Sequence, residues 1–273
     1  MIRRLSSVAG LLAVLLAAGA AGASPLHAAA PSSSDARAYG KHCQGQSKTR
    51  TAGSRLTPFA RCVTAMARLA GAGSRSPRIA CAGLSRKRVA GAGATPYARC
   101  VRSGARLIRH GNGIDRAFVD EMIPHHVAAV EMARLAPGRA QTPFVLGLAS
   151  EIIRSQNAEI ATMRRMSARL RAAGIRPVSM RLSRAEMGMD HDASHLLNAN
   201  PFDVAFAQMM IPHHQGAITM SRVLLARGAA RATKQLARQI MSSQSSEIRA
   251  MRGFLAQAGA PPVAPGAGHD DHH

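Results

Sequence analysis

The sequence predicts an all-α protein: a four-helix bundle made of two duplicated helical hairpins, preceded by a small disulfide-stapled N-terminal module. Three observations support this prediction. One segment recurs after 88 residues, a second segment recurs after 38 residues and carries the four cysteines, and apolar residues in the later part follow one another at intervals of four and three positions. The hydrophobic content of 47% is enough for a globular core.

The chain begins with the layout of a secretory signal peptide. Arg3 and Arg4 precede an apolar run over residues 8–21, which ends in small residues. We assign residues 1–30 to this signal, with cleavage near residues 23–30. The mature protein is therefore expected outside the cytoplasm, secreted or periplasmic. No later stretch is long and apolar enough to span a bilayer, so we expect no integral membrane segment in the mature chain.

The formal net charge of +22 raises the question of a polyanionic partner. The basic residues are spread along the chain, and there are no tryptophans and only two tyrosines on which bases could stack. Export also argues against a genomic target. We therefore predict no nucleic-acid partner.

Residues 31–110 form a basic module of two repeats. The segment TPFARCV at residues 57–63 returns as TPYARCV at residues 95–101, and Cys43, Cys62, Cys81 and Cys100 are evenly spaced by 19. In an exported protein, four cysteines without Cys-x-x-Cys spacing predict two disulfides rather than a zinc site. Of the three connectivities we favour Cys43–Cys62 with Cys81–Cys100, because each bridge then stays inside its own repeat. Short helices are expected around residues 58–69 and 96–108.

The pattern of this module does not indicate a function. Between residues 31 and 114, sixteen Lys or Arg residues stand against one acidic residue, Asp35. This imbalance would suit an anionic envelope polymer as a partner. A plain solvated surface is the alternative, and the composition favours it.

The second repeat contains the two hairpins, at residues 111–174 and 203–258. The pentad MIPHH at residues 122–126 returns at residues 210–214, and the pattern Q-x-x-E-I-x-x-M at residues 156–163 returns at residues 244–251. Both offsets are 88, so a two-helix unit has been duplicated without insertion. A linker at residues 175–202 separates the copies, and a His-rich tail follows at residues 259–273.

Helical spacing places the repeated residues on inward-facing seams. In the first helix, Phe118, Met122, His125, Ala129 and Met132 are separated by four, three, four and three positions, and the second copy repeats this spacing. Asp115 and Asp203 are predicted to cap the starts of these helices.

Proline interrupts the pattern of each first helix, at Pro124 and Pro212. Proline removes one backbone hydrogen bond, so we expect a kink or a fresh helix start directly before the histidines. Amide groups at such a start would disfavour protonated imidazole.

Polar residues on the seams predict a metal site. A packing role alone would require only apolar side chains, and buried polar groups without partners are costly. The alternative is a structural set of hydrogen bonds in which Glu and Gln hold the histidines. Because imidazole and thioether together suit copper, Cu(I) above all, or silver, we predict a copper ion and no organic cofactor. The candidate ligands are His125, His126, His213, His214, Met122, Met210, Met132, Met220, Glu159, Glu247, Met163 and Met251, with Gln156 and Gln244 behind them.

Accessory ligands are expected from two further segments. The linker carries Met187, Met189, His191 and His195, and the tail carries His269, His272 and His273. Short His-rich tails bind metal ions with little specificity.

The combined pattern F-x-x-x-M-I-P-H-H followed by Q-x-x-E-I-x-x-M resembles the family of domains of unknown function numbered 305 (DUF305). The resemblance covers about residues 112–258 and includes both copies of the motif. It implies a ferritin-like four-helix bundle and an exported copper-binding or copper-tolerance protein. It does not extend to the cysteine repeats.

Three functional hypotheses follow. In the first, the protein sequesters or carries copper outside the cytoplasm without catalysing a reaction, and this is the one we favour. In the second, the same His and Met cluster serves a metal-dependent redox enzyme. In the third, the basic module contacts the envelope and the histidine pairs are structural. No Ser-His-Asp set, phosphate loop or cofactor fingerprint supports an enzyme.

Overall fold

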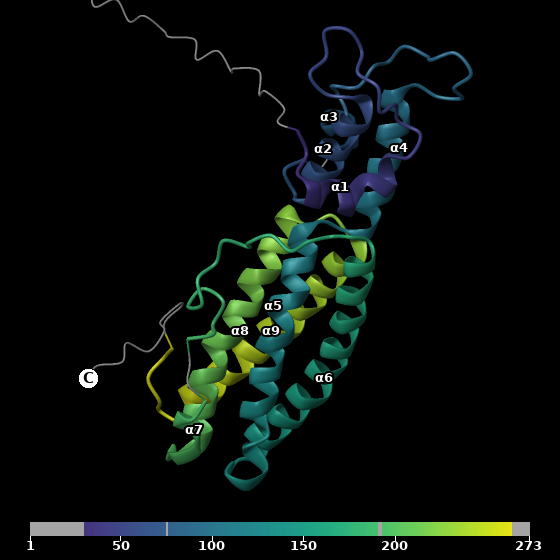
Figure 1. Ribbon diagram of the computed structural model, residues 1–273. Coiled ribbons are helices and arrows are strands. Elements are labelled where there is room, and N and C mark those ends of the chain that lie inside the picture. The colour runs from purple at the N-terminus through teal and green to yellow at the C-terminus, as the bar shows by residue number, and fades with distance from the viewer. Residues whose placement is uncertain (1–29, 75, 191–192, 264–273) are drawn as a thin grey trace, which may run out of the picture.

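Two helical hairpins pack side by side and carry the N-terminal module at one end (Figure 1). The computed structural model describes residues 30–74, 76–190 and 193–263. In the module, the helices are α1 (Ser33–Tyr39), α2 (Pro58–Ala70), α3 (Pro77–Ala80) and α4 (Pro96–His110), with a 3₁₀ turn at Gly40–Cys43. In the bundle they are α5 (Gly113–Ala133), α6 (Pro143–Ala172), α8 (Phe202–Arg227) and α9 (Arg231–Gln257), with short α7 (His195–Asn198) and a 3₁₀ turn at Ala136–Gly138.

The bundle confirms the predicted fold class. α5 pairs with α6, α8 pairs with α9, and the first helices of the two hairpins, α5 and α8, pack against each other. One long connection, residues 173–201, joins the hairpins, as in ferritin-like bundles. No helix among the described residues is long and apolar enough to cross a membrane.

The N-terminal module is held by two disulfides, Cys43–Cys62 and Cys81–Cys100, with Cα atoms 5.8 and 6.0 Å apart. This is the connectivity that the repeats favour. The predicted short helices are confirmed as α2 and α4. Each begins at a proline after a threonine cap, because the Thr57 and Thr95 hydroxyls accept hydrogen bonds from backbone N–H groups three residues later.

The prediction that Asp115 caps its own helix is wrong. The N-cap of α5 is Asn112, whose side-chain oxygen accepts the N–H groups of Ile114 and Asp115. Asp115 returns one bond by accepting the N–H of Asn112 at 2.8 Å, which completes a capping box. Its remaining acceptor capacity is directed to the other hairpin.

Each of the two aspartates binds the start of the second helix of the opposite hairpin. Asp115 accepts the backbone N–H groups of Ala229 and Ala230 at 2.7 and 3.1 Å, directly before α9. Asp203, likewise predicted to cap its own helix, accepts the N–H of Thr142 at 2.8 Å and its hydroxyl at 2.6 Å, directly before α6. The carboxylates therefore satisfy helix N-terminal N–H groups and join the hairpins to each other.

The prolines do not start new helices. α5 continues through Pro124 and α8 through Pro212, so the fresh start is not observed. Each proline lacks one N–H donor. Pro124 is exposed and Pro212 is buried, but both lie beside buried residues such as Met122 and Met210, and tertiary packing maintains the helix. The histidines that follow lie in helix interiors, and free amide groups at a helix start do not explain their chemistry.

Candidate metal centre

The imidazoles of His125 and His213 meet at the contact between α5 and α8. Their ring centroids are 3.7 Å apart and the ring planes are inclined by 37°. Both residues are buried, with 0% and 2% of their surface exposed. Since the two positions are equivalent in the repeat, the contact lies on the pseudo-twofold axis that relates the hairpins. The duplication thus brings its own two copies together in the bundle interior.

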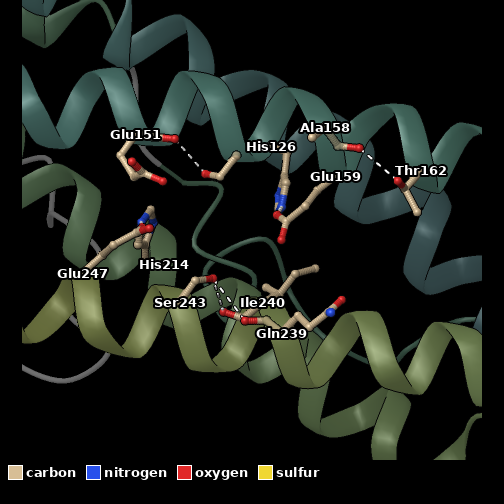
Figure 2. Close-up of polar contacts among 11 residues, drawn as sticks. His126, Glu151, Ala158, Glu159, Thr162, His214, Gln239, Ile240, Ser243 and Glu247 are labelled. Atoms are coloured by element: carbon tan, nitrogen blue, oxygen red, sulfur yellow. Dashed lines mark hydrogen bonds and ion pairs between the residues drawn. The ribbon is translucent and has the colours of Figure 1, made fainter.

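The neighbouring histidines each pair with a glutamate on the second helix of the same hairpin (Figure 2). His126 Nε2 lies 2.7 Å from Glu159 Oε2, and His214 Nε2 lies 2.5 Å from Glu247 Oε2. The Nδ1 atoms of both histidines are buried without a hydrogen-bond partner.

These pairs show one contact of each glutamate. Glu159 and Glu247, which the sequence predicts as metal ligands, each place one carboxylate oxygen on an imidazole. A carboxylate on one ring nitrogen fixes the ring orientation and leaves the other nitrogen as the free ligand atom. The same hydrogen bonds also agree with the alternative hypothesis, in which glutamate holds histidine for a purely structural purpose.

Burial sets the protonation of His125. Desolvation lowers the pKa of its imidazole well below 6.5, and the nearby His126 and His214 rings lower it further. Backbone groups of His213 and Met187 favour the proton and oppose part of this effect. Neither ring nitrogen of His125 makes a hydrogen bond of normal geometry. The imidazole is therefore neutral at neutral pH, because of burial rather than because of a helix end.

Six seam methionines divide into two sets that the pseudo-symmetry relates. Met122, Met163 and Met220 belong to one buried apolar cluster, and the equivalent set, Met210, Met251 and Met132, belongs to the other. All six side chains are at most 2% exposed. Each set takes two methionines from one hairpin and the third from the first helix of the other hairpin. The sequence places these residues on seams but does not show how the sets cross between hairpins.

The two seam glutamines are buried, each with 2% exposure. The predicted hydrogen bonds to the ligand set are not evident: the side-chain oxygen of Gln156 and both polar atoms of the Gln244 amide lack partners. These atoms are buried polar groups without a partner, and each glutamine lies three residues before Glu159 or Glu247 on the same helix. Such groups are rare in buried sites and are often found where a ligand or water binds.

The crossover loop approaches the histidines through two glycines. A Cβ atom on Gly216 would lie 2.0 Å from the carbonyl oxygen of Met187, and one on Gly188 would lie 2.5 Å from the carbonyl oxygen of Pro212. The backbone of Met187 therefore lies against α8 two residues after His214, and the side chains of Met187 and Met189 are half-buried. The sequence contained a signal for this contact, because Gly216 replaces Ala128 of the first copy.

The other accessory residues are not placed at the site. His195 is exposed on α7. His191, His269, His272 and His273 lie outside the described residues. Among the residues that the structure describes, no three His, Cys, Asp or Glu side chains are grouped so that they could hold a metal ion without other ligands.

An open groove of about 660 Å³ lies beside the histidine turn of α8. Pro212, Gln215 and Gly216 form part of its wall, and Ile248 of α9 forms part of its apolar lining. Exposed arginines of α8 and α9 and two acidic residues of the crossover loop surround it. The groove therefore adjoins the turn of α8 that carries the second MIPHH copy.

Solved structures similar to this chain include CopM in its Cu(I)-bound form, with 31% identity over 53% of this chain and 96% of that chain, at a TM-score of 0.45. They also include CopM in an Ag-bound form, with 33% identity over 52% and 95% at a TM-score of 0.45. A DUF305 fragment from Deinococcus radiodurans shares 32% identity over 54% and 98%, at a TM-score of 0.45.

No curated protein matches the chain. The sequence model of the family described as "Domain of unknown function (DUF305)" matches residues 115–255 and 203–273, which include both copies of the hairpin. With more than half of its length matched, the chain belongs to the DUF305 family.

Proposed function

We propose that the protein binds copper, Cu(I) in particular, and sequesters or carries it outside the cytoplasm without catalysing a reaction. The observation that carries the proposal is the contact of His125 with His213 in a buried interior that also contains two symmetric sets of three methionines. The two disulfides agree with an oxidising compartment, where such bonds persist.

The donor set favours a soft ion. Thioether sulfur and neutral imidazole bind Cu(I) or Ag(I) well, whereas Mg²⁺, Ca²⁺ and Mn²⁺ prefer oxygen. Six methionines and four histidines of the two hairpins are buried. One carboxylate oxygen of Glu159 and of Glu247 bonds to a histidine, and we expect sulfur and imidazole nitrogen to be the principal donors to the ion.

The two methionine sets predict that a bound ion would affect how the hairpins are held together. Because each methionine set combines thioethers of both hairpins, an ion held by such a set would link the hairpins. The backbone of Met187 packs against Gly216, two residues after the second histidine pair, and the half-buried thioethers of Met187 and Met189 are further candidate donors. Copper binding is therefore expected to stabilise the fold, since the ligands are assembled only in the folded chain.

Competition for Cu(I) tests the proposal. The protein without its last five residues is titrated against a chromophoric Cu(I) chelator, beside a variant in which His125, His126, His213 and His214 are all changed to Ala. A control replaces an exposed histidine outside the predicted ligand set, His110→Ala. We expect the parent and the control to compete for copper and the fourfold variant to fail while it remains helical.

Equal competition by the parent and the fourfold variant would contradict the proposal. Failure of the parent to compete at all would do the same. In either case the histidine and glutamate pairs would be structural polar packing.

A further inference from the structure

The two halves of the N-terminal module carry loops of the same structure, which we call the basic loops: residues 47–56 and 85–94. Each loop ends where the next helix begins. The N–H of Phe59 bonds to the carbonyl of Ser47 at 2.9 Å, and the equivalent bond from Tyr97 to Ser85 measures 3.0 Å. The duplication has therefore preserved a loop conformation as well as the cysteines.

The turn at the tip of each loop is also the same. The N–H of Ser54 bonds to the carbonyl of Thr51, and that of Ala92 bonds to the carbonyl of Val89, both at 3.0 Å. The glycines within these turns have φ of 72° at Gly53 and 73° at Gly91, a left-handed conformation that suits glycine. Both tips therefore share one backbone turn.

Both loops expose positive charge without acidic neighbours. Neither loop contains Asp or Glu, and six of their residues are exposed cations: Lys48, Arg50, Arg55, Arg86, Lys87 and Arg88. Asp35, the one acidic residue of the module, forms an ion pair with Arg176 of the segment after α6. The charge of the loops is thus left for a partner outside the module.

The second repeat also exposes two large apolar side chains. Val89, at the tip of the second loop, is 56% exposed, and Ile79 of α3 is 72% exposed. They are the most exposed large hydrophobic residues in the part of the chain that the structure describes. The first loop has Thr51 where the second has Val89, so this apolar tip is specific to the second repeat.

The loops lie far from the copper-binding interior. The second loop precedes α4, a helix of 15 residues whose other end continues into α5. At a rise of about 1.5 Å per residue, α4 separates this loop from the bundle by roughly 20 Å. Figure 1 shows the loops of the module projecting away from the four long helices. A flat surface can therefore approach them without meeting the bundle.

We propose that the two basic loops dock the protein on an anionic lipid surface, with the phosphate groups of lipids bound by the six cations and Val89 inserted into the interface. Charge alone would also fit a soluble anionic polymer. Such a polymer would leave Val89 in water, whereas a bilayer interface would bury it. The inference is independent of copper binding, because it uses no residue of the bundle.

Vesicle flotation tests this docking. The protein without residues 1–30 is mixed with vesicles of phosphatidylcholine, with or without added phosphatidylglycerol, at low and high salt. We expect binding only when the anionic lipid is present, and loss of that binding at high salt. Circular dichroism and a thiol assay confirm that each variant is folded with both disulfides closed.

Matched variants locate the docking surface. The triple change Arg86→Gln, Lys87→Gln and Arg88→Gln should weaken binding by about a hundredfold, at about fivefold for each basic residue near the membrane. The control changes three exposed arginines of α6, Arg164→Gln, Arg165→Gln and Arg169→Gln, and removes the same charge. It should weaken binding far less. Equal losses in both variants would show diffuse attraction and overturn the proposal.

The tip residue separates a lipid surface from a soluble polymer. The protein has no tryptophan, so Val89→Trp introduces a single indole whose emission reports its surroundings. We expect a blue shift with anionic vesicles and weaker binding for Val89→Asp. Failure to bind anionic vesicles would refute lipid docking. So would binding without a blue shift and with Val89→Asp unchanged, and tight binding to polyphosphate would then identify a polymer as the partner.

Discussion

The carboxylate of Asp115 on α5 accepts a hydrogen bond from the hydroxyl of Thr233 on α9, 118 positions later in the chain. Asp115 also accepts the N–H groups of Ala229 and Ala230. A residue of the first hairpin therefore holds the start of α9, a helix of the second hairpin. Asp203 does the same for α6, so two reciprocal contacts join the hairpins.

Asp115→Asn is expected to destabilise the protein by about 2–4 kcal/mol, because an amide accepts fewer of these bonds and buried N–H groups lose their partner. Asp203→Asn should act in the same direction. Urea unfolding followed by circular dichroism measures the change. As a control, Glu151→Gln alters an exposed ion pair with Arg154 and should change stability by less than about 0.5 kcal/mol. A similar small effect for Asp115→Asn would contradict the assigned role.

The two glutamates are expected to act through the histidines. Glu159→Gln combined with Glu247→Gln should weaken copper binding by about 10- to 100-fold, because the carboxylates orient the rings that hold the ion. The loss should be smaller than that of the fourfold histidine variant. Glu131→Gln, an exposed change on α5, serves as the control. A loss as complete as that of the histidine variant would indicate that the glutamates bind the ion directly.

The methionine sets can be tested without disturbing the core. Each methionine set has one member from the opposite hairpin: Met220 in the set with Met122 and Met163, and Met132 in the set with Met210 and Met251. Met132→Leu and Met220→Leu each remove that thioether. Since leucine has nearly the volume of methionine, stability should change by less than about 1.5 kcal/mol. Cu(I) affinity should fall by at least about tenfold, measured by chelator competition. Met66→Leu, in the buried core of the N-terminal module, should leave the affinity unchanged.

The pH dependence of stability follows from the lowered pKa of His125. Below its ordinary pKa of 6.5, the unfolded chain binds a proton that the buried imidazole resists. The free energy of unfolding therefore decreases as pH falls below that value, by up to about 1.4 kcal/mol per pH unit for this residue. Urea titrations of the metal-free protein measure the slope. His125→Gln should reduce it, and an identical slope in that variant would assign the effect to other groups.

The contact between the crossover loop and α8 depends on Gly216. Gly216→Ala places a methyl group against the Met187 carbonyl and should displace the loop, which speeds hydrogen exchange at residues 184–190. Gly253→Ala is the matched control, because a Cβ atom there meets nothing within 4 Å. It should stabilise α9 by about 0.5–1 kcal/mol. Unchanged exchange in Gly216→Ala would show that the loop tolerates the shift.

Much of the candidate site could be predicted from the repeat, and some of it could not. The seam spacing correctly placed His125, Met122 and Met163 in the interior. It could not predict the hydrogen-bond partners of Asp115 or the continuous helix at Pro124, because both are set by neighbouring segments of the fold. A buried aspartate near a helix start caps whichever N–H groups are close, and a proline is tolerated where packing maintains the helix.

The sequence by itself determined the helices, the pairing of consecutive helices into hairpins and the preference for disulfides within repeats, because periodicity and short connections are properties of contiguous segments. The tertiary structure decided which residues meet across the pseudo-twofold axis. The packing of α5 against α8 brings His125 into contact with His213. It also places methionines of both hairpins in each buried set and lets the crossover loop pack against Gly216. That packing is set by burial of the whole interface, a free energy that no single segment contains.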